Sequence, residues 1–192
     1  MAGAGLGVEP RELGSVAVAV GPGGFTGLRV SIAFAKAVAL ARGISLVPVP
    51  SALLFAASDH ARGGDRSDGP WLVALAAKGE TAWTVLVEDL RRHEAEGRVL
   101  DAAGFAAMAR VVAGSQGALL ADEFLDPALA ECARDAGLPQ GDLRVEIAAF
   151  AEISAAILRA RGTVAPAALL PIYAREPEAV TNWRTRNPGR GS

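Results

Sequence analysis

The sequence predicts an α/β protein, and three observations lead to that prediction. Apolar segments of strand length alternate along the chain with segments of helical length. The apolar run 16–20 leads through a glycine-rich turn into the long apolar stretch 25–42, which gives a strand, a turn and a helix in succession. The chain has 192 residues, 51% of them hydrophobic, so it can bury one sizeable core or two small ones.

The turn between this strand and helix is rich in glycine. Glycine adopts backbone angles closed to other residues, so a structural turn is the default interpretation, and valine at Gly23 or Gly27 is expected to destabilise the fold by roughly 1–3 kcal/mol. The alternative is an anion site at the helix N-terminus. The order Phe-Thr-Gly-Leu-Arg lacks the Gly-Lys-Ser/Thr of a phosphate-binding loop, and Thr26 replaces the third glycine of the dinucleotide fingerprint. The predicted structural turn comprises Gly21, Pro22, Gly23, Gly24, Thr26 and Gly27.

The helix 25–42 is apolar on nearly every side. Its charges before the last residue are Arg29 and Lys36, seven residues apart and therefore on one narrow stripe. Small residues form two rows at four-residue spacing: Ser31, Ala35 and Ala39 in one, Ala33, Ala37 and Ala41 in the other. Burial against the chain's own sheet explains one row, and the second row indicates another neighbour.

The next elements are predicted from apolar runs and from the glycine, proline and serine residues that bound them. Gly43 is a plausible C-cap, and residues 44–49 form a strand whose two prolines place it at an edge or a bend. Ser51 is expected to cap a short helix, 52–58, and a surface loop spans 60–70. Strands 71–77 and 81–88 then flank a hairpin turn, and 88–97 is a solvated charged stretch.

The second half continues the alternation of helices and strands. Asp101 caps a helix that runs to about Val112, residues 118–121 form a strand, and Pro127 begins a helix that ends at Gly137. A strand over 143–147 and a last helix over 148–161 complete the pattern. We predict a partial first subdomain over 1–68 and a second α/β subdomain over 69–175, with the last helix as a candidate to pack back on the first. Residues 176–192, with three arginines and one tryptophan, are predicted to be a flexible tail.

Composition narrows the function. The 19 basic and 21 acidic residues do not give the basic surface that holding tRNA alone requires. No apolar run reaches membrane-spanning length without a charge, and the single cysteine, Cys132, fits a reducing compartment, so we expect a cytoplasmic protein. The two histidines, His60 and His93, lie in segments read as loops, far apart in sequence, so neither a metal site nor a serine-protease triad is predicted. We predict no catalytic residues.

Four segments carry a resemblance to a known family. GPGGFTGLRV at 21–30, AFAKAVAL at 33–40 and GISLVPV at 43–49 resemble the TsaB (YeaZ) family, and PIYAR at 171–175 resembles its C-terminal motif. These proteins are dimerisation subunits of the bacterial complex that makes threonylcarbamoyladenosine in tRNA, within the Gcp-like (peptidase M22-like) group. The resemblance implies an actin/Hsp70/sugar-kinase-like (ribonuclease H-like) fold. Because family members carry further strands before the glycine turn, it also implies a first subdomain incomplete at its N-terminus.

The resemblance implies a non-catalytic scaffold without a cofactor. Its expected partners are a TsaD-like catalytic subunit and a TsaE-like ATPase, with a homodimer in isolation and only indirect contact with tRNA. The alternative is a nucleotide-binding transferase or kinase-like enzyme of the same fold, with phosphate at residues 21–27. The predicted partner interface comprises Phe25, Leu28, Arg29, Ser31, Ile32, Ala35, Lys36 and Ala39.

Overall fold

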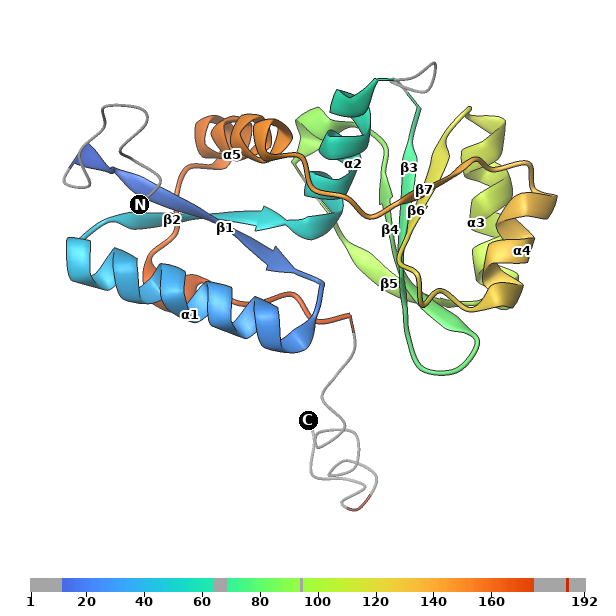
Figure 1. Cartoon of the computed structure of the whole chain (residues 1–192), viewed down its shortest axis with the longest axis horizontal. Helices are drawn as coiled ribbons and strands as arrows, with labels where there is room; N and C mark the ends of the chain where they lie inside the picture. Colours follow the sequence, from blue (N-terminus) through green and yellow to red (C-terminus); the bar gives the residue numbers. More distant parts are fainter. Residues whose placement is uncertain (1–11, 64–68, 94, 175–185, 187–192) are drawn as a thin grey trace.

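The computed structural model describes residues 12–63, 69–93, 95–174 and 186. Strands and helices alternate as the sequence predicted, and the strands form two separate sheets (Figure 1). The first sheet pairs β1 with β2, and the second has the order β5-β4-β3-β6-β7. The predicted tail 176–192 lies outside the described residues apart from Arg186.

The first sheet is parallel and is covered on both faces. Strand β1 (Ser15–Gly21) pairs with β2 (Ser45–Pro50), and helix α1 (Phe25–Arg42) connects them. Side chains alternate along β1: Val18 and Val20 pack against α1, whereas Ala17 packs toward α2 (Ser51–Arg62) and α5 (Ile147–Arg161). The continuous apolar sequence of β1 therefore serves two cores.

Segments from the end of the chain reach both edges of this sheet. The Ile172 N–H donates to the Val20 carbonyl at 2.7 Å beside β1. Next to β2, Leu46 and Val164 form an antiparallel bridge. The C-terminal segment therefore closes over a layer that is built from the first fifty residues.

The second sheet is mixed. Strand β3 (Trp71–Ala76) pairs antiparallel with β4 (Thr81–Val87), and β4 pairs antiparallel with β5 (Gly97–Asp101). On the other side, β3 pairs parallel with β6 (Ala118–Ala121), and β6 with β7 (Gln140–Asp142). Helices α3 (Ala102–Gly114) and α4 (Pro127–Asp135) cover one face through a core that includes Phe105 and Leu129.

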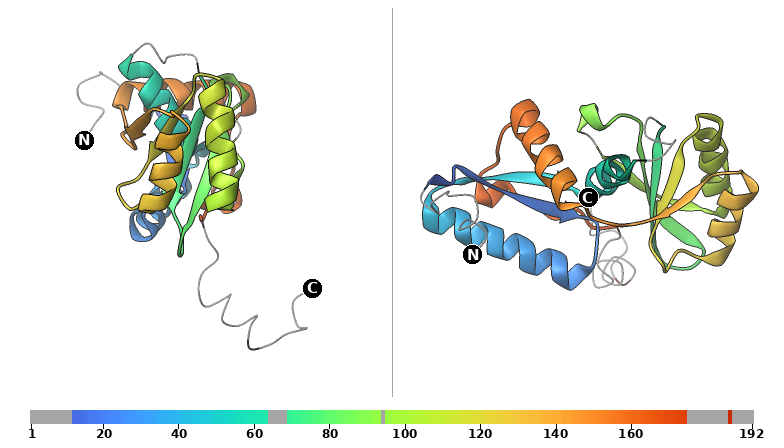
Figure 2. Two further views of the ribbon diagram at one scale, coloured as in Figure 1. Left: turned by 90° about the vertical axis from the view of Figure 1, so that its right-hand side faces the viewer. Right: turned by 45° about the horizontal axis from the view of Figure 1, so that its top comes forward.

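Helix α2 lies between the two sheets and joins their cores. One continuous cluster contains Val47 and Val49 of β2, Trp71 and Trp83 of the second sheet, and Ile153 of α5. We call the first sheet with α1 and α5 the first lobe, and the second sheet with α3 and α4 the second lobe. Helix α5 packs back onto β2 and α2, and the two lobes share buried surface (Figure 2).

The local structure differs from expectation in three places. Helix α2 begins at Ser51 without a side-chain cap and continues to Arg62, so His60 is helical. A strand that was not predicted, β5, begins at the last residue of the charged stretch, Gly97, and the indole of Trp83 lies where a Cβ on that glycine would be. Residues 143–146 are not a strand, because the parallel partner of β6 is the shorter, polar β7 that precedes them.

Most helix boundaries follow the predicted caps. Gly43 ends α1 in the left-handed conformation, and the carboxylates of Asp101 and Asp126 accept from the N–H groups of Gly104 and Ala128 at 2.8 and 2.9 Å. Within the described part of the chain, no helix is long and apolar enough to cross a membrane.

Candidate partner-binding surface

The turn that begins α1 depends on one glycine in particular. Gly21 has φ +98°, and a Cβ there would lie 2.6 Å from the Ile172 carbonyl oxygen and 2.8 Å from Leu28 Cδ2. A Cβ at Gly23, Gly24 or Gly27 would meet nothing within 4 Å. Pro22 is buried, whereas Thr26 is exposed. The destabilisation expected of valine at Gly23 or Gly27 therefore finds no support in backbone strain or a Cβ contact, and the constraint lies at Gly21.

Four of the predicted interface residues belong to the chain's own core. Their side chains form the inner face of α1 and pack on Val18, Val20, Leu46 and Leu169. They are only 1–8% exposed, so they do not offer a surface to a partner. The physical reason is helical spacing, which puts these positions on one stripe facing the sheet. These four residues are Leu28, Ile32, Ala35 and Ala39.

The opposite side of α1 is exposed and apolar. Val30, Phe34 and Leu40 are 64%, 71% and 72% exposed. The second alanine row lies among them, so one small-residue row faces the sheet and the other faces solvent. The helix lies at the margin of the first lobe, with nothing of the described chain on this side (Figure 1). We call this surface the outer face; it comprises Val30, Ala33, Phe34, Ala37, Leu40 and Ala41.

The remaining predicted residues flank the outer face. Phe25 and Arg29 are exposed, and Lys36 is half-buried on the same flank, whereas Ser31 lies on the other flank. The hydroxyl of Ser31 donates to the Leu28 carbonyl of the preceding turn at 3.0 Å. No cation lies within the outer face itself, so it can be desolvated without burying a charge.

Arg29 ties the start of α1 to the C-terminal motif. Its guanidinium stacks 3.7 Å from the centroid of the Phe25 ring, and its Nε donates to the Tyr173 hydroxyl at 3.2 Å. The Phe25 and Tyr173 rings lie 5.8 Å apart. Two motifs separated by most of the chain therefore meet beside the glycine turn.

A cleft of about 560 Å³ opens at this turn, between the two lobes. Phe25, Phe55, Phe124 and Tyr173 line it, and its charged group is the carboxylate of Asp122. That carboxylate accepts from the N–H groups of Ala76 and Phe124 at 3.1 and 3.2 Å. Aromatic rings and a carboxylate facing Gly23 and Gly24 are unfavourable surroundings for a phosphate. Among the residues the structure places, no three His, Cys, Asp or Glu side chains converge as a metal ion requires.

Val30, Phe34 and Leu40 were not among the residues singled out from the sequence. The sequence does contain a pattern that groups them, because these three residues and the second alanine row recur at helical spacing. What the sequence did not show was which side of an all-apolar helix faces inward.

Comparisons with known proteins agree with this architecture. The family model described as "TsaD: tRNA N6-adenosine threonylcarbamoyltransferase" matches residues 2–148. A search of curated proteins found no match.

Two solved structures are similar to the chain. YeaZ from Pseudomonas aeruginosa superposes with a TM-score of 0.64 at 16% identity, over 88% of this chain and 78% of that one. An uncharacterized protein with similarity to peptidase YeaZ from Pseudomonas aeruginosa gives a TM-score of 0.58 at 18% identity, over 91% and 79%. Identities this low show the fold alone, and that fold is the predicted actin/Hsp70/sugar-kinase-like architecture.

Proposed function

Because the chain belongs to the family described as TsaD, tRNA N6-adenosine threonylcarbamoyltransferase, we propose that it is a non-catalytic subunit that supports this modification of tRNA. Membership of the family supports a role in tRNA threonylcarbamoylation. The finer assignment, a scaffold that binds the catalytic subunit, rests on the surface of α1. In this role the protein works in the cytoplasm.

The exposed outer face of α1 is the observation that carries the proposal. Removing a Val, Leu or Phe side chain from water contributes about 1.5–3 kcal/mol per residue. The outer face has three such side chains together, each more than half exposed, with alanines between them. A contiguous apolar surface of this kind is typical of an interface with another protein.

The shape of the outer face is suited to packing against a second helix. The alanine row Ala33, Ala37 and Ala41 leaves a groove along the helix axis, and Phe34 projects beside it. Such a surface is self-complementary across a two-fold axis, since the ring of one copy fits beside the alanines of the other. We therefore expect a homodimer in isolation. In the working assembly a TsaD-like catalytic subunit takes the same face, and a TsaE-like ATPase joins them.

Two observations support a non-catalytic role. The cleft at the glycine turn is lined by aromatic rings and a carboxylate, which does not favour the phosphate of the alternative, kinase-like function. Arg29, the cation nearest the turn, is already engaged by Phe25 and Tyr173. Titration calorimetry of the purified protein with ATP and with ADP is expected to give no binding heat.

The test of the proposal replaces residues of the outer face with glutamate. Phe34→Glu and Ala37→Glu should each convert a dimer into a monomer in sedimentation analysis, because burying an unpaired carboxylate is costly. Both should also abolish co-elution with a TsaD-like subunit. Helix content measured by circular dichroism should not change, since both positions face solvent.

Val111→Glu is the matched control, because Val111 is an exposed apolar residue of α3, far from α1. This variant should remain a dimer. A wild-type protein that stays monomeric and does not bind the TsaD-like subunit would contradict the proposal, as would turnover of a substrate by the purified chain alone.

A further inference from the structure

A second surface lies on the opposite side of the first lobe from α1. Helices α2 and α5 and the short 3-10 helix η2 (Leu90–Arg92) border an open hollow of about 770 Å³. The sequence placed His60 and His93 in unrelated loops, whereas the fold brings both to this hollow, His60 from α2 and His93 from the residue after η2. Arg91 and Arg159 line it as well. We call it the arginine hollow.

The two guanidinium groups of the arginine hollow have no acidic partner among the described residues. Arg91 and Arg159 are both exposed, and neither forms an ion pair with another residue that the structure describes. Three other arginines are paired: Arg62, Arg92 and Arg144 contact Asp59, Glu88 and Asp142 at 3.0–3.1 Å. The lining of the hollow therefore carries two guanidinium groups that no described carboxylate neutralises.

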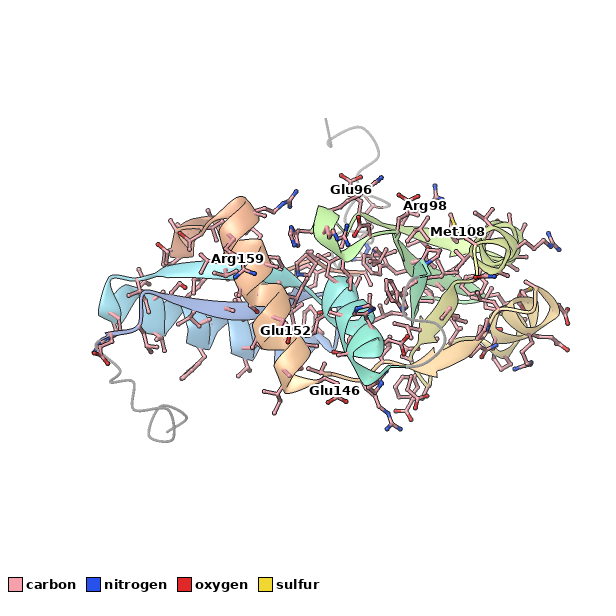
Figure 3. The ribbon with its side chains drawn as sticks, turned by 90° about the horizontal axis from the view of Figure 1, so that it is seen from above. Glu96, Arg98, Met108, Glu146, Glu152 and Arg159 are labelled. Carbon is pink, nitrogen blue, oxygen red and sulfur yellow. The ribbon has the colours of Figure 1, made fainter. Side chains whose placement is uncertain are left out.

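One carboxylate opposes them. Glu152 lies on α5 two turns before Arg159, and both project from the surface of that helix seen from above in Figure 3. With two arginines and one glutamate, the lining carries one excess positive charge, although the whole chain has a net charge of −2. Because this positive charge is confined to the hollow, it favours binding of an anionic group there.

The uncharged part of the lining is apolar and consists largely of alanines, with Leu90 and Ile153 beside them. Ala57 and Ala61 come from α2, and Ala149 and Ala156 come from α5. Alanine lets a ligand approach the helix backbones closely, and arginines of two separate elements, η2 and α5, border the same hollow. A planar guanidinium matches the oxygens of a phosphate with two parallel hydrogen bonds.

We propose that the arginine hollow binds phosphate groups of the tRNA backbone, so that this subunit contacts tRNA directly. The identity of the RNA rests on the proposed function, because the family acts on adenosine in tRNA. Contacts to phosphates carry no sequence information, and they would position the tRNA relative to the catalytic subunit. The low net charge of the chain favours only indirect contact with tRNA, whereas the fold brings two arginines to one place, which is enough for a weak direct contact.

The test measures binding of fluorescein-labelled, unmodified tRNA transcript to the full chain by fluorescence anisotropy at several salt concentrations. Arg91→Gln with Arg159→Gln should weaken binding about tenfold at low salt and make the salt slope less negative by about 1.5–2, since two phosphate contacts are lost. Glu152→Gln removes the opposing charge and should tighten binding about two- to threefold.

Arg110→Gln with Arg134→Gln is the matched control. These arginines are exposed on α3 and α4, on the other face of the second sheet, and their loss changes the net charge by the same amount. This variant should bind tRNA nearly as the wild type does. Equal weakening by the two double variants would overturn the proposal, because binding would then follow the overall charge.

Two further outcomes would also overturn it: no binding of tRNA at low salt, or binding of poly-glutamate through the same arginines as tightly as tRNA. The second result would assign the hollow to an acidic protein segment. Co-elution with the TsaD-like subunit separates this inference from the proposed function, because the arginine variants leave the outer face of α1 intact. Failure of tRNA binding with co-elution retained would refute the inference alone.

Discussion

Gly21 is the residue at which the glycine turn meets the rest of the molecule. Its φ of +98° is open to glycine and strained for other residues, and a Cβ would press on the Ile172 carbonyl and on Leu28. Ile172 also donates to Val20, so the C-terminal segment is fixed at this point. The turn is therefore a structural junction whose tightest contact is with residues near the end of the chain.

Gly21→Ala is expected to lower the free energy of unfolding by about 2–5 kcal/mol, since backbone strain and a steric overlap are added together. Urea denaturation followed by circular dichroism measures the loss. Gly23→Ala is the control and should change stability by less than about 0.5 kcal/mol, because nothing lies within 4 Å of its Cβ position. Equal losses of unfolding free energy in the two variants would show that any change in the turn is destabilising, and that the contact with Ile172 is not the cause.

Helix α1 has two apolar faces with different roles. The inner face packs on β1, β2 and Leu169, and the outer face has no neighbour among the described residues. Substitutions of neighbouring alanines on the two faces should therefore have different effects. A substitution on the inner face affects folding, and one on the outer face affects association.

Ala35→Trp and Ala37→Trp form a matched pair that compares the inner and outer faces of α1. Ala35 is 3% exposed, so an indole there overfills the core and should destabilise the protein by about 1–3 kcal/mol or prevent folding. Ala37 is exposed, so Ala37→Trp should leave the urea midpoint of the monomer nearly unchanged. A similar loss of stability in both variants would mean that the outer face is also packed against the chain.

The two lobes are joined through one buried cluster. Helix α5 and strand β2 contribute to it from one side, and Trp71 and Trp83 from the other. The boundary near residue 68 that the sequence analysis proposed therefore divides two sheets that share a core. We expect the lobes to unfold in a single transition.

Ile157→Ala tests this shared core, because Ile157 of α5 is 2% exposed within it. The expected loss is about 2–5 kcal/mol. In a Trp183→Phe background, tryptophan emission reports from Trp71 and Trp83 in the second lobe, whereas circular dichroism reports from both lobes. The two signals should shift to lower urea together. A shift of the circular dichroism signal alone would show that the lobes fold independently.

The sequence alone determined most of the local structure. The capping residues Gly43 and Asp101, Pro127 at the start of a helix, and the alternation of apolar segments predicted α1, α3, α4 and α5 to within a few residues. The glycine turn and the helix that follows it indicated the family. These features depend on near neighbours in the chain, so they can be read from it. The segment 143–147 misled because β-branched residues favour a strand wherever a partner exists, and the fold gives that partner to β7 instead.

Only the tertiary structure decided which side of α1 is a surface. Leu28, Ile32, Ala35 and Ala39 are as apolar as Val30, Ala33, Phe34 and Ala37, so periodicity contains no difference between them. Residues distant in sequence, among them Leu46 and Leu169, cover the first set and leave the second exposed. The same holds for the arginine hollow, whose lining comes from three separate elements. Burial is a property of the whole packed chain, and for that reason both surfaces became visible only in the fold.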